Sequence, residues 1–315
     1  MRSKKRLGKS LEDISHLFLS GFSAPASVKS VDSSGRMPGP PAVRRTRVWL
    51  ALSLVREVPS AFFAGNLGIE LARCGRRTLL IETAPLPSLD KIFGTIQIQP
   101  SLNDLLEQSN KQVTIEGALG MRILSFRFCP DELREFSPEE QEILSQILLR
   151  EEEAAELILI HAVYEEGPLL ERFLKIGQGV ILAASPSGDT ILETYRVCKY
   201  LYSVHPGLRI GLAVYERGGG EATAAWKEKL TDAVGRFLEK SLEWHGTIPD
   251  DPLVEHSLTA KVPVTLLDRT SKTSLGFVSV AEGLQRGAEV VPARSATTHS
   301  FFNGFQRTLN GPGDP

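Results

Sequence analysis

The chain has 315 residues, of which 42% are hydrophobic and 23% are charged, and its formal net charge at pH 7 is −2. This balance is typical of a globular protein with a sizeable core, and it excludes a disordered, collagen-like or disulfide-rich chain. The three cysteines form no metal-binding pattern, and no apolar run reaches the roughly 18 residues of a membrane-spanning helix. We therefore expect a cytoplasmic protein with reduced thiols, without a secretory signal or a bound metal.

The first 47 residues are predicted to form a basic arm. They carry ten Lys or Arg and three acidic residues, a charge of +7, so the remainder of the chain carries −9. A short amphipathic helix is predicted at about residues 10–21, with apolar side chains on one face. These side chains are Leu11, Ile14, Leu17, Phe18 and Phe22. Residues 22–47 are rich in Ser, Pro and Gly, which predicts a flexible linker.

The arm helix is interpreted as a docking segment. A helix this short is marginal alone in water, so we expect it to fold on a protein partner. Its basic flank leaves contact with an anionic membrane as an alternative, and packing on the chain's own domain is the plain structural alternative. Nucleic-acid binding is not expected, because the folded body is acidic and the basic residues cluster in the arm.

Short apolar runs and amphipathic stretches alternate after the arm. The apolar runs predict strands at 48–54, 78–82, 122–126, 157–161, 179–184, 209–215 and 243–249. Helices are predicted at 60–74, 101–108, 138–156, 188–204, 221–240 and 272–285. The alternation predicts an α/β fold, a doubly wound, mostly parallel sheet with helices on both faces, over residues 48–285. Residues 286–315 predict a disordered tail.

Several segments of this body match motifs of a known protein family. Residues 66–81 match "NLAxxLAxxGxxVLLID", residues 185–195 match "TxPExxAxxDAY", and residues 246–254 match "GxIPxDxxV". The segments 101–106 and 157–160 follow the same order. Over roughly 48–285 the chain resembles the MinD/ParA family of SIMIBI-class deviant P-loop ATPases, and within it the MinD proteins that regulate flagellar number. The resemblance implies a P-loop NTPase-like fold.

The resemblance fails at the nucleotide loop. The family's loop reads "SGKGGVGKTT", and its glycines let backbone N–H groups point at phosphate oxygens. The aligned segment runs from Ser53 to Phe62 and holds neither glycine nor lysine. The resemblance places Val55 at the signature lysine, Ser60 at the phosphate-binding lysine and Ala61 at the Mg²⁺-binding hydroxyl. Glu57 adds a negative charge, and Pro59 lacks an N–H.

Three positions at other strand ends also depart from the family. The resemblance places Glu82 at the catalytic aspartate, His161 at the aspartate that holds the Mg²⁺ waters, and Tyr215 at the asparagine that reads adenine. A lone histidine in such a site is interpreted as a neutral replacement. We therefore expect no catalytic, cofactor-binding or metal-binding residue, and no cofactor.

These departures predict a pseudo-ATPase. We expect a non-hydrolysing scaffold or accessory subunit in a bacterial surface-organelle, secretion or cell-positioning system, as a homodimer or paired with an active MinD-like relative. One alternative is an active MinD-like ATPase in division, flagellar or partitioning positioning. Another is a nucleotide-free membrane or DNA tether that acts through the basic arm, in which case the protein would lie at the inner face of the plasma membrane.

Overall fold

The computed structural model describes residues 46–83, 88–94, 106, 113–125, 136–186, 190–217 and 220–289. By its internal contacts the chain divides into residues 1–44 and 45–315, and every described residue lies in the second unit. The predicted arm helix, with Leu11, Ile14, Leu17, Phe18 and Phe22, lies outside the described residues. So does the predicted tail beyond residue 289.

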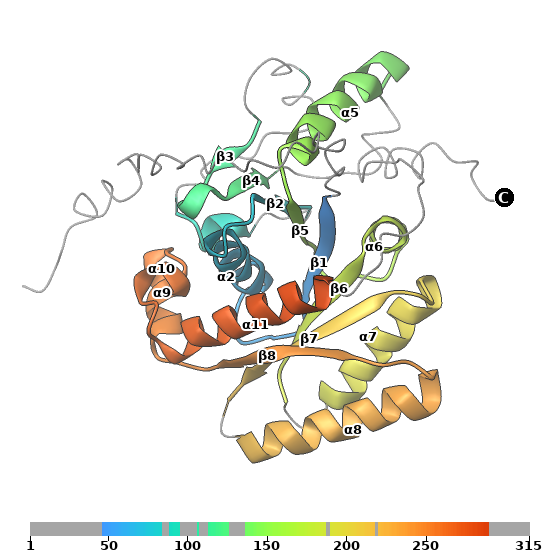
Figure 1. The fold of residues 1–315 in the computed structure, drawn as a ribbon, viewed down its shortest axis with the longest axis vertical. Coiled ribbons are helices and arrows are strands. Elements are labelled where there is room, and N and C mark those ends of the chain that lie inside the picture. Colours follow the sequence, from blue (N-terminus) through green and yellow to red (C-terminus); the bar gives the residue numbers. More distant parts are fainter. Residues whose placement is uncertain are drawn as a thin grey trace, which may run out of the picture. The chain divides into compact units, whose positions relative to one another are not determined.

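An eight-stranded sheet forms the centre of the described unit (Figure 1). Its strands are β1 (Arg47–Ser53), β2 (Thr78–Glu82), β3 (Ile115–Glu116), β4 (Arg122–Ser125), β5 (Leu157–His161), β6 (Gly179–Ala184), β7 (Arg209–Glu216) and β8 (Glu243–Pro249). Their order across the sheet is β3-β4-β2-β5-β1-β6-β7-β8, and only the β3–β4 pair is antiparallel. The predicted doubly wound, mostly parallel α/β fold is confirmed.

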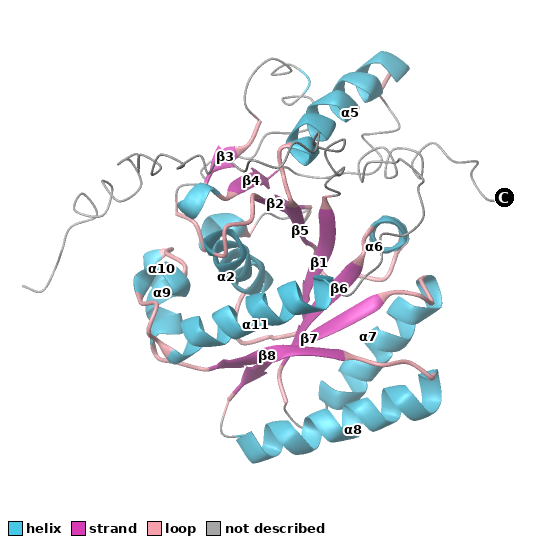
Figure 2. Ribbon diagram, viewed as in Figure 1, coloured by secondary structure: helices cyan, strands magenta, loops and turns pink. Residues whose placement is uncertain are grey.

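Helices cover both faces of the sheet (Figure 2). On one face lie α5 (Pro138–Glu153), α6 (Pro168–Ile176), α7 (Thr190–Val204) and α8 (Gly220–Leu238). On the other lie α2 (Ser60–Arg73), α9 (Leu253–Ala260), α10 (Val264–Leu267) and α11 (Lys272–Glu289). Two short 3-10 turns, η1 (Leu89–Lys91) and η2 (Ala118–Gly120), complete the described elements. No helix among the described residues combines the length and apolar character that crossing a membrane requires.

The central strand β1 divides the core into two clusters because alternate side chains of a strand point to opposite faces. Leu50 and Leu52 pack with the α5–α8 side, whereas Trp49 and Ala51 pack with the α2–α11 side. All four are at most 1% exposed. Since both faces of β1 are buried, its sequence is a continuous apolar run rather than an alternating one.

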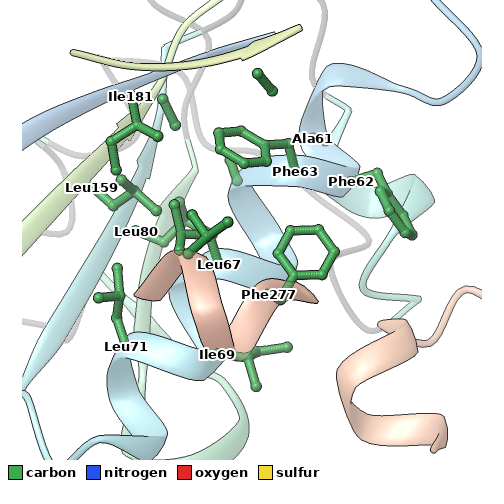
Figure 3. Close-up of a cluster of buried hydrophobic side chains, with 14 of the residues drawn as sticks. Ala61, Phe62, Phe63, Leu67, Ile69, Leu71, Leu80, Leu159, Ile181 and Phe277 are labelled. Atoms are coloured by element: carbon green, nitrogen blue, oxygen red, sulfur yellow. The ribbon is translucent and has the colours of Figure 1, made fainter. Parts of the chain in front are cut away.

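The α2–α11 cluster is rich in aromatic rings at the start of α2 (Figure 3). Phe277 of α11 lies 5.8 Å from Phe62 and 6.2 Å from Phe63 between ring centroids. Leu67, one turn further along α2, is fully buried in the same cluster. Complete burial of one such side chain stabilises the fold by about 2–3 kcal/mol, so α2 is firmly held on the sheet.

Two glycines bring α11 close to the edge strand β8. A Cβ on Gly276 would lie 2.7 Å from the Cα of Ile248, and one on Gly283 would lie 2.5 Å from the carbonyl oxygen of His245. These separations are too short for any side chain, so only glycine permits this approach. The close contact fixes the position of α11 and therefore of Phe277.

The helix predictions were largely confirmed. Ser137 caps α5 and accepts a hydrogen bond from Glu140 N, with Pro138 at the first helical position. α11 extends to Glu289, four residues beyond the predicted end. The short helices α6, α9 and α10 were not predicted. The predicted helix at 101–108 lies outside the described residues, except for residue 106.

Candidate functional site

The carboxyl ends of four neighbouring strands form one edge of the sheet. β4, β2, β5 and β1 are adjacent and parallel, so their last residues lie side by side. Glu82 at the end of β2 is level with Ser125 of β4 and with His161 of β5. Ser60, the first residue of α2, contacts His161 and therefore lies beside these strand ends. Ligands of open parallel sheets bind at this edge, which makes it the candidate site.

The first residues after β1 use their backbone N–H groups within the protein. Leu54 N donates to the carbonyl oxygen of Ala183 at 2.8 Å. Val55 N donates to Oγ of Ser53 at 3.3 Å. The Val55 side chain, at the predicted position of the signature lysine, is buried in the α2–α11 cluster. This part of the loop is therefore fixed to the sheet and carries no side-chain cation.

The rest of the loop follows the same pattern. Arg56 N donates to Oε2 of Glu57 at 3.0 Å, and both side chains are exposed. Phe62 N donates to the carbonyl oxygen of Pro59 at 2.8 Å. Pro59 itself has no N–H to offer. The N–H groups of Leu54, Val55, Arg56 and Phe62 are thus already bonded, and a phosphate group here would also meet the carboxylate of Glu57.

A side-chain hydrogen bond joins the start of α2 to the end of β5. Oγ of Ser60 lies 3.0 Å from Nε2 of His161. His161 is 1% exposed, whereas Ser60 is only half-buried. The resemblance had placed these two residues at the phosphate-binding lysine and at an Mg²⁺-site aspartate. The structure brings them together, so each is the other's partner.

Glu82 is the most heavily bonded side chain of the site. Its Oε1 accepts from Ser88 N at 2.6 Å, from Ser88 Oγ at 3.2 Å and from Leu89 N at 3.0 Å. Its Oε2 accepts from Oγ of Ser125 at 2.7 Å. The carboxylate is fully buried, and Nδ1 of His161 lies 3.6 Å from Oε1, beyond hydrogen-bonding range but within ion-pair range. A carboxylate bonded in this way has little capacity left for metal-bound water.

The hydrogen bonds to Glu82 outweigh its burial. Burial alone would raise the pKa of this carboxyl, but its interactions with His161, Ser125 and the N–H of Ser88 lower the pKa to about 2. Glu82 is therefore ionised at neutral pH. The site holds a permanent, buried negative charge next to the ring of His161.

Tyr215, predicted at the adenine-reading position, is tied to the β8 end. Its hydroxyl donates to Oδ1 of Asp250 at 2.8 Å, and Nε of Arg217 donates to Oδ2 at 3.0 Å. Burial and the Asp250 carboxylate raise the pKa of Tyr215. Burial by itself would raise the pKa of Asp250, but the hydrogen bonds that its carboxylate accepts from Tyr215 and Arg217 lower this pKa. Tyr215 is thus a neutral, engaged donor.

The rim of the site carries an exposed ion pair. Nη2 of Arg56 lies 3.0 Å from both carboxylate oxygens of Glu193 on α7. The Arg56 side chain is 80% exposed, so this pair is screened by solvent. Within the described ranges no cluster of three or more His, Cys, Asp or Glu could hold a metal ion.

Sequence reasoning missed the contacts that give the site its present form. Neither the Ser60–His161 bond nor the Ser125–Glu82 bond was predicted. The position of these residues in the sequence could have indicated the contacts, because each side chain lies at or near the end of a predicted strand or at the start of a predicted helix. Residues 84–87, which follow Glu82 in the chain, lie outside the described residues.

Comparison with curated proteins finds a relative of this chain by sequence. The antiactivator FleN of Pseudomonas aeruginosa is 24% identical over 220 residues, which cover 69% of this chain and 78% of FleN. No protein-family model matches the chain.

Comparison with solved structures gives the fold. A ParA-family ATPase from Chlorobium tepidum TLS superposes with a TM-score of 0.58 at 15% identity, covering 76% of this chain and 99% of that chain. MinD in the MinC:MinD cell division protein complex of Aquifex aeolicus gives a TM-score of 0.56 at 18% identity, covering 79% and 98%. Together with FleN, these likenesses confirm the predicted resemblance to the MinD/ParA family and its P-loop NTPase-like fold.

Proposed function

We propose that this MinD/ParA-like protein neither binds nor hydrolyses ATP. We further propose that it serves as a scaffold or accessory subunit in a bacterial surface-organelle, secretion or cell-positioning system. The observation that carries the proposal is the Ser60–His161 hydrogen bond. Two side chains that the family resemblance assigns to phosphate and Mg²⁺ handling are bonded to each other.

The loop chemistry supports the loss of triphosphate binding. The segment from Ser53 to Phe62 offers no lysine, and its N–H groups at Leu54, Val55, Arg56 and Phe62 bond within the protein. The exposed Glu57 carboxylate would repel a phosphate by on the order of 4 kcal/mol at 4 Å with an effective dielectric near 20. Each missing phosphate donor costs a further 3–4 kcal/mol or so of transition-state stabilisation.

The residues present also do not fit a Mg²⁺–nucleotide complex. Ala61 has no hydroxyl to bind the metal, and the carboxylate oxygens of Glu82 already accept four hydrogen bonds. His161, where a carboxylate would be needed, bonds to Ser60. Neither the phosphate side nor the metal side of such a complex finds its usual partners.

A chain that cannot bind nucleotide cannot use nucleotide as a switch. A ligand shifts a conformational equilibrium only by its difference in affinity for the two states. We therefore propose a fixed-state protein that acts by docking, as a homodimer or beside an active relative. A location in the cytoplasm, at times at the inner face of the membrane, accords with this role.

A protein partner is the expected ligand. The Aquifex neighbour is a complex of MinD with MinC, and FleN is described as an antiactivator. We propose that this chain likewise acts on a protein, and that the arm helix with Leu11, Ile14, Leu17, Phe18 and Phe22 makes the contact. Its apolar face provides the spacing that helix-in-groove binding requires.

Calorimetric titration with ATP·Mg²⁺ tests the nucleotide proposal. We expect no saturable heat up to millimolar nucleotide, and no phosphate release above that of a Glu82→Gln, Ser60→Ala double variant. An active MinD measured in parallel establishes the sensitivity of both assays. Micromolar affinity for ATP·Mg²⁺ would overturn the proposal and favour the active-ATPase alternative.

Two variants of the arm test the docking proposal. Leu17→Glu places a charge on the apolar face of the predicted helix, whereas His16→Glu places the same charge on the opposite face. In a pull-down from the native host we expect the first variant to lose its protein partner and the second to retain it. Equal capture by both variants contradicts the proposed contact.

A further inference from the structure

Three polar side chains from separate elements lie next to one another at the candidate site. Ser60 begins α2, His161 ends β5 and Glu82 ends β2. Oγ of Ser60 lies 3.0 Å from Nε2 of His161, and Nδ1 of His161 lies 3.6 Å from Oε1 of Glu82. The hydroxyl is half-buried, and the other two side chains are buried. A hydroxyl, an imidazole and a carboxylate thus follow one another from the accessible end inward.

The charge on Glu82 determines which nitrogen of His161 carries the proton. Nδ1 is buried, has no hydrogen-bond partner and faces the ionised carboxylate. A proton on Nδ1 is attracted to that charge, which leaves the Nε2 lone pair free to accept from Ser60. In this tautomer His161 is oriented as a base toward the Ser60 hydroxyl.

Glu82 is itself held rigidly in place. Oε2 is fixed by Ser125, and Oε1 by Ser88 and Leu89. The carboxylate therefore cannot rotate away from His161. A buried, fixed negative charge stabilises an imidazolium when His161 takes up a proton, which is the task of the acid in a Ser-His-acid triad.

We propose that Ser60, His161 and Glu82 form a nucleophilic centre that hydrolyses carboxylic esters. Ser60 and His161 are the catalytic residues, and Glu82 is the positioning residue. This activity goes beyond the proposed scaffold role and does not depend on it.

The proposed reaction has two balanced halves. Oγ of Ser60 attacks the carbonyl carbon of the ester while Nε2 of His161 takes the hydroxyl proton, and collapse of the tetrahedral intermediate breaks the bond to the alkoxy group. His161 returns the proton to the leaving alcohol, which leaves an acyl group on Ser60. Water then attacks this acyl group, gives a proton to His161, and releases the carboxylic acid as Ser60 recovers its proton.

The start of α2 provides the electrostatic support for this step. The first N–H groups of a helix have no acceptor within the helix, and its positive dipole end faces the nucleophile. In the proposed reaction the N–H of Ala61, in the first turn of α2, stabilises the oxyanion. In α/β-hydrolase triads the serine also lies at a strand-to-helix turn, and the acid and then the histidine follow it in the chain. This analogy concerns the order of the residues alone.

The first experiment uses the full chain with p-nitrophenyl acetate and a fluorophosphonate probe. We expect catalysed ester cleavage and a single phosphonyl adduct on the peptide that contains Ser60. Ser60→Ala should abolish the adduct, and His161→Asn should lower its rate of formation by about 10²- to 10⁴-fold. Ser203→Ala, which removes an exposed serine hydroxyl at the far end of α7, serves as the control and should behave as wild type.

Two outcomes would overturn the proposal. One is the absence of an adduct on Ser60 in protein whose thermal melt shows a native fold. The other is ester cleavage that survives in Ser60→Ala, which would assign it to other groups. Neither outcome bears on the nucleotide proposal, which is tested separately by calorimetry with ATP·Mg²⁺.

The pH profile tests Glu82 as a positioning residue. In wild type the labelling rate is measured as a function of pH up to its plateau. Glu82→Gln should lower the plateau by at least about 10²-fold, because the neutral amide no longer favours a proton on Nδ1. A purely structural role would leave the plateau unchanged in folded protein. Ser203→Ala is again the control and should be labelled at the wild-type rate.

Discussion

The first turn of α2 and its later turns differ in how they relate to the MinD/ParA motifs. From Asn66 onward the family pattern persists, and the α2 residues that carry it, Asn66 to Ala72, are buried. In the preceding loop and first turn none of the motif's glycines or lysines is present. Here Ala61 and Phe62 lie in the core, while Ser60 faces the strand ends. The later turns are thus held by packing, whereas the first turn lacks the motif's glycines and lysines.

Asn66 illustrates why the later turns are constrained. Its Nδ2 donates to the carbonyl oxygen of Phe62 at 2.9 Å, and its Oδ1 accepts from both N and Oγ1 of Thr265 at 3.1 Å. One buried side chain thereby joins α2 to α10. The comparison shows two kinds of motif residue. Some, such as Asn66, hold the fold together, whereas the glycines and lysines of the family's loop have a ligand as their partner.

The largest expected effect comes from the buried later turns. Leu67→Ala should lower the free energy of unfolding by about 4 kcal/mol, because it removes a fully buried side chain and leaves a cavity. Urea denaturation measures the change. Leu192→Ala, on an α7 side chain that is 58% exposed, is the matched control and should cost less than about 0.5 kcal/mol. If the two variants lost equal amounts of stability, the claim that packing of the later turns holds α2 in place would be wrong.

Acid should reveal the next largest effect, at Glu82. Its pKa is lowered to about 2 from a normal value of 4.5. The folded state binds this proton less readily than the unfolded chain does, so the stabilisation is complete above about pH 5 and is lost as the pH falls toward 2. The total is about 3 kcal/mol. Denaturation midpoints between pH 6 and pH 2.5 should fall less in Glu82→Gln than in wild type.

A smaller cost is expected at Asn66. Asn66→Ala leaves the N–H and hydroxyl of Thr265 without their acceptor, which should lower the free energy of unfolding by about 2 kcal/mol. Thr265→Val and the double variant complete a cycle that isolates the pair. A coupling energy near zero would show that Asn66 has no structural task, contrary to the comparison.

Ser60 should matter less to stability than Asn66. Ser60→Ala removes one hydrogen bond at a half-buried position, so we expect a loss of about 1 kcal/mol in urea denaturation. Ser203→Ala again provides the reference for losing a serine hydroxyl. A loss above about 3 kcal/mol would mean that the altered first turn supports the fold as strongly as the later turns do.

The smallest effect is predicted at the rim. Arg56→Ala breaks the exposed pair with Glu193 and should change the free energy of unfolding by less than about 0.5 kcal/mol. Repeating the measurement in 0.5 M salt should reduce the difference further, because surface pairs are screened. A change above 1 kcal/mol would assign the loop a larger structural role than its exposure indicates.

The sequence predicted the elements that are long and uniformly apolar or strongly periodic. β5 and β6 match their predicted bounds, because a strand buried on both faces is an uninterrupted apolar run. The two-residue strand β3 and the nine-residue helix α6 escaped prediction, since such short segments are stabilised by their neighbours. The proline at the start of α6 was a usable signal.

At the site, strand ends could be predicted but contacts could not. The resemblance singled out Ser60, Glu82 and His161 as departures from one nucleotide site, and the structure places them together. Their bonding depends on the path of the loop before α2 and on the register that sets Ser125 beside Glu82. Neither can be read from residue types, because both are products of long-range packing.

The position of β1 in the middle of the sheet has a consequence for synthesis. Arg47 pairs with Leu157, and Trp49 pairs with Gly179, so both neighbours of the strand come from far along the chain. On the ribosome this apolar segment emerges well before any strand that can cover it. Such long-range pairing slows folding and prolongs exposure to aggregation. In the nascent chain β1 therefore lacks both of its strand partners until residues up to Ala184 have been made.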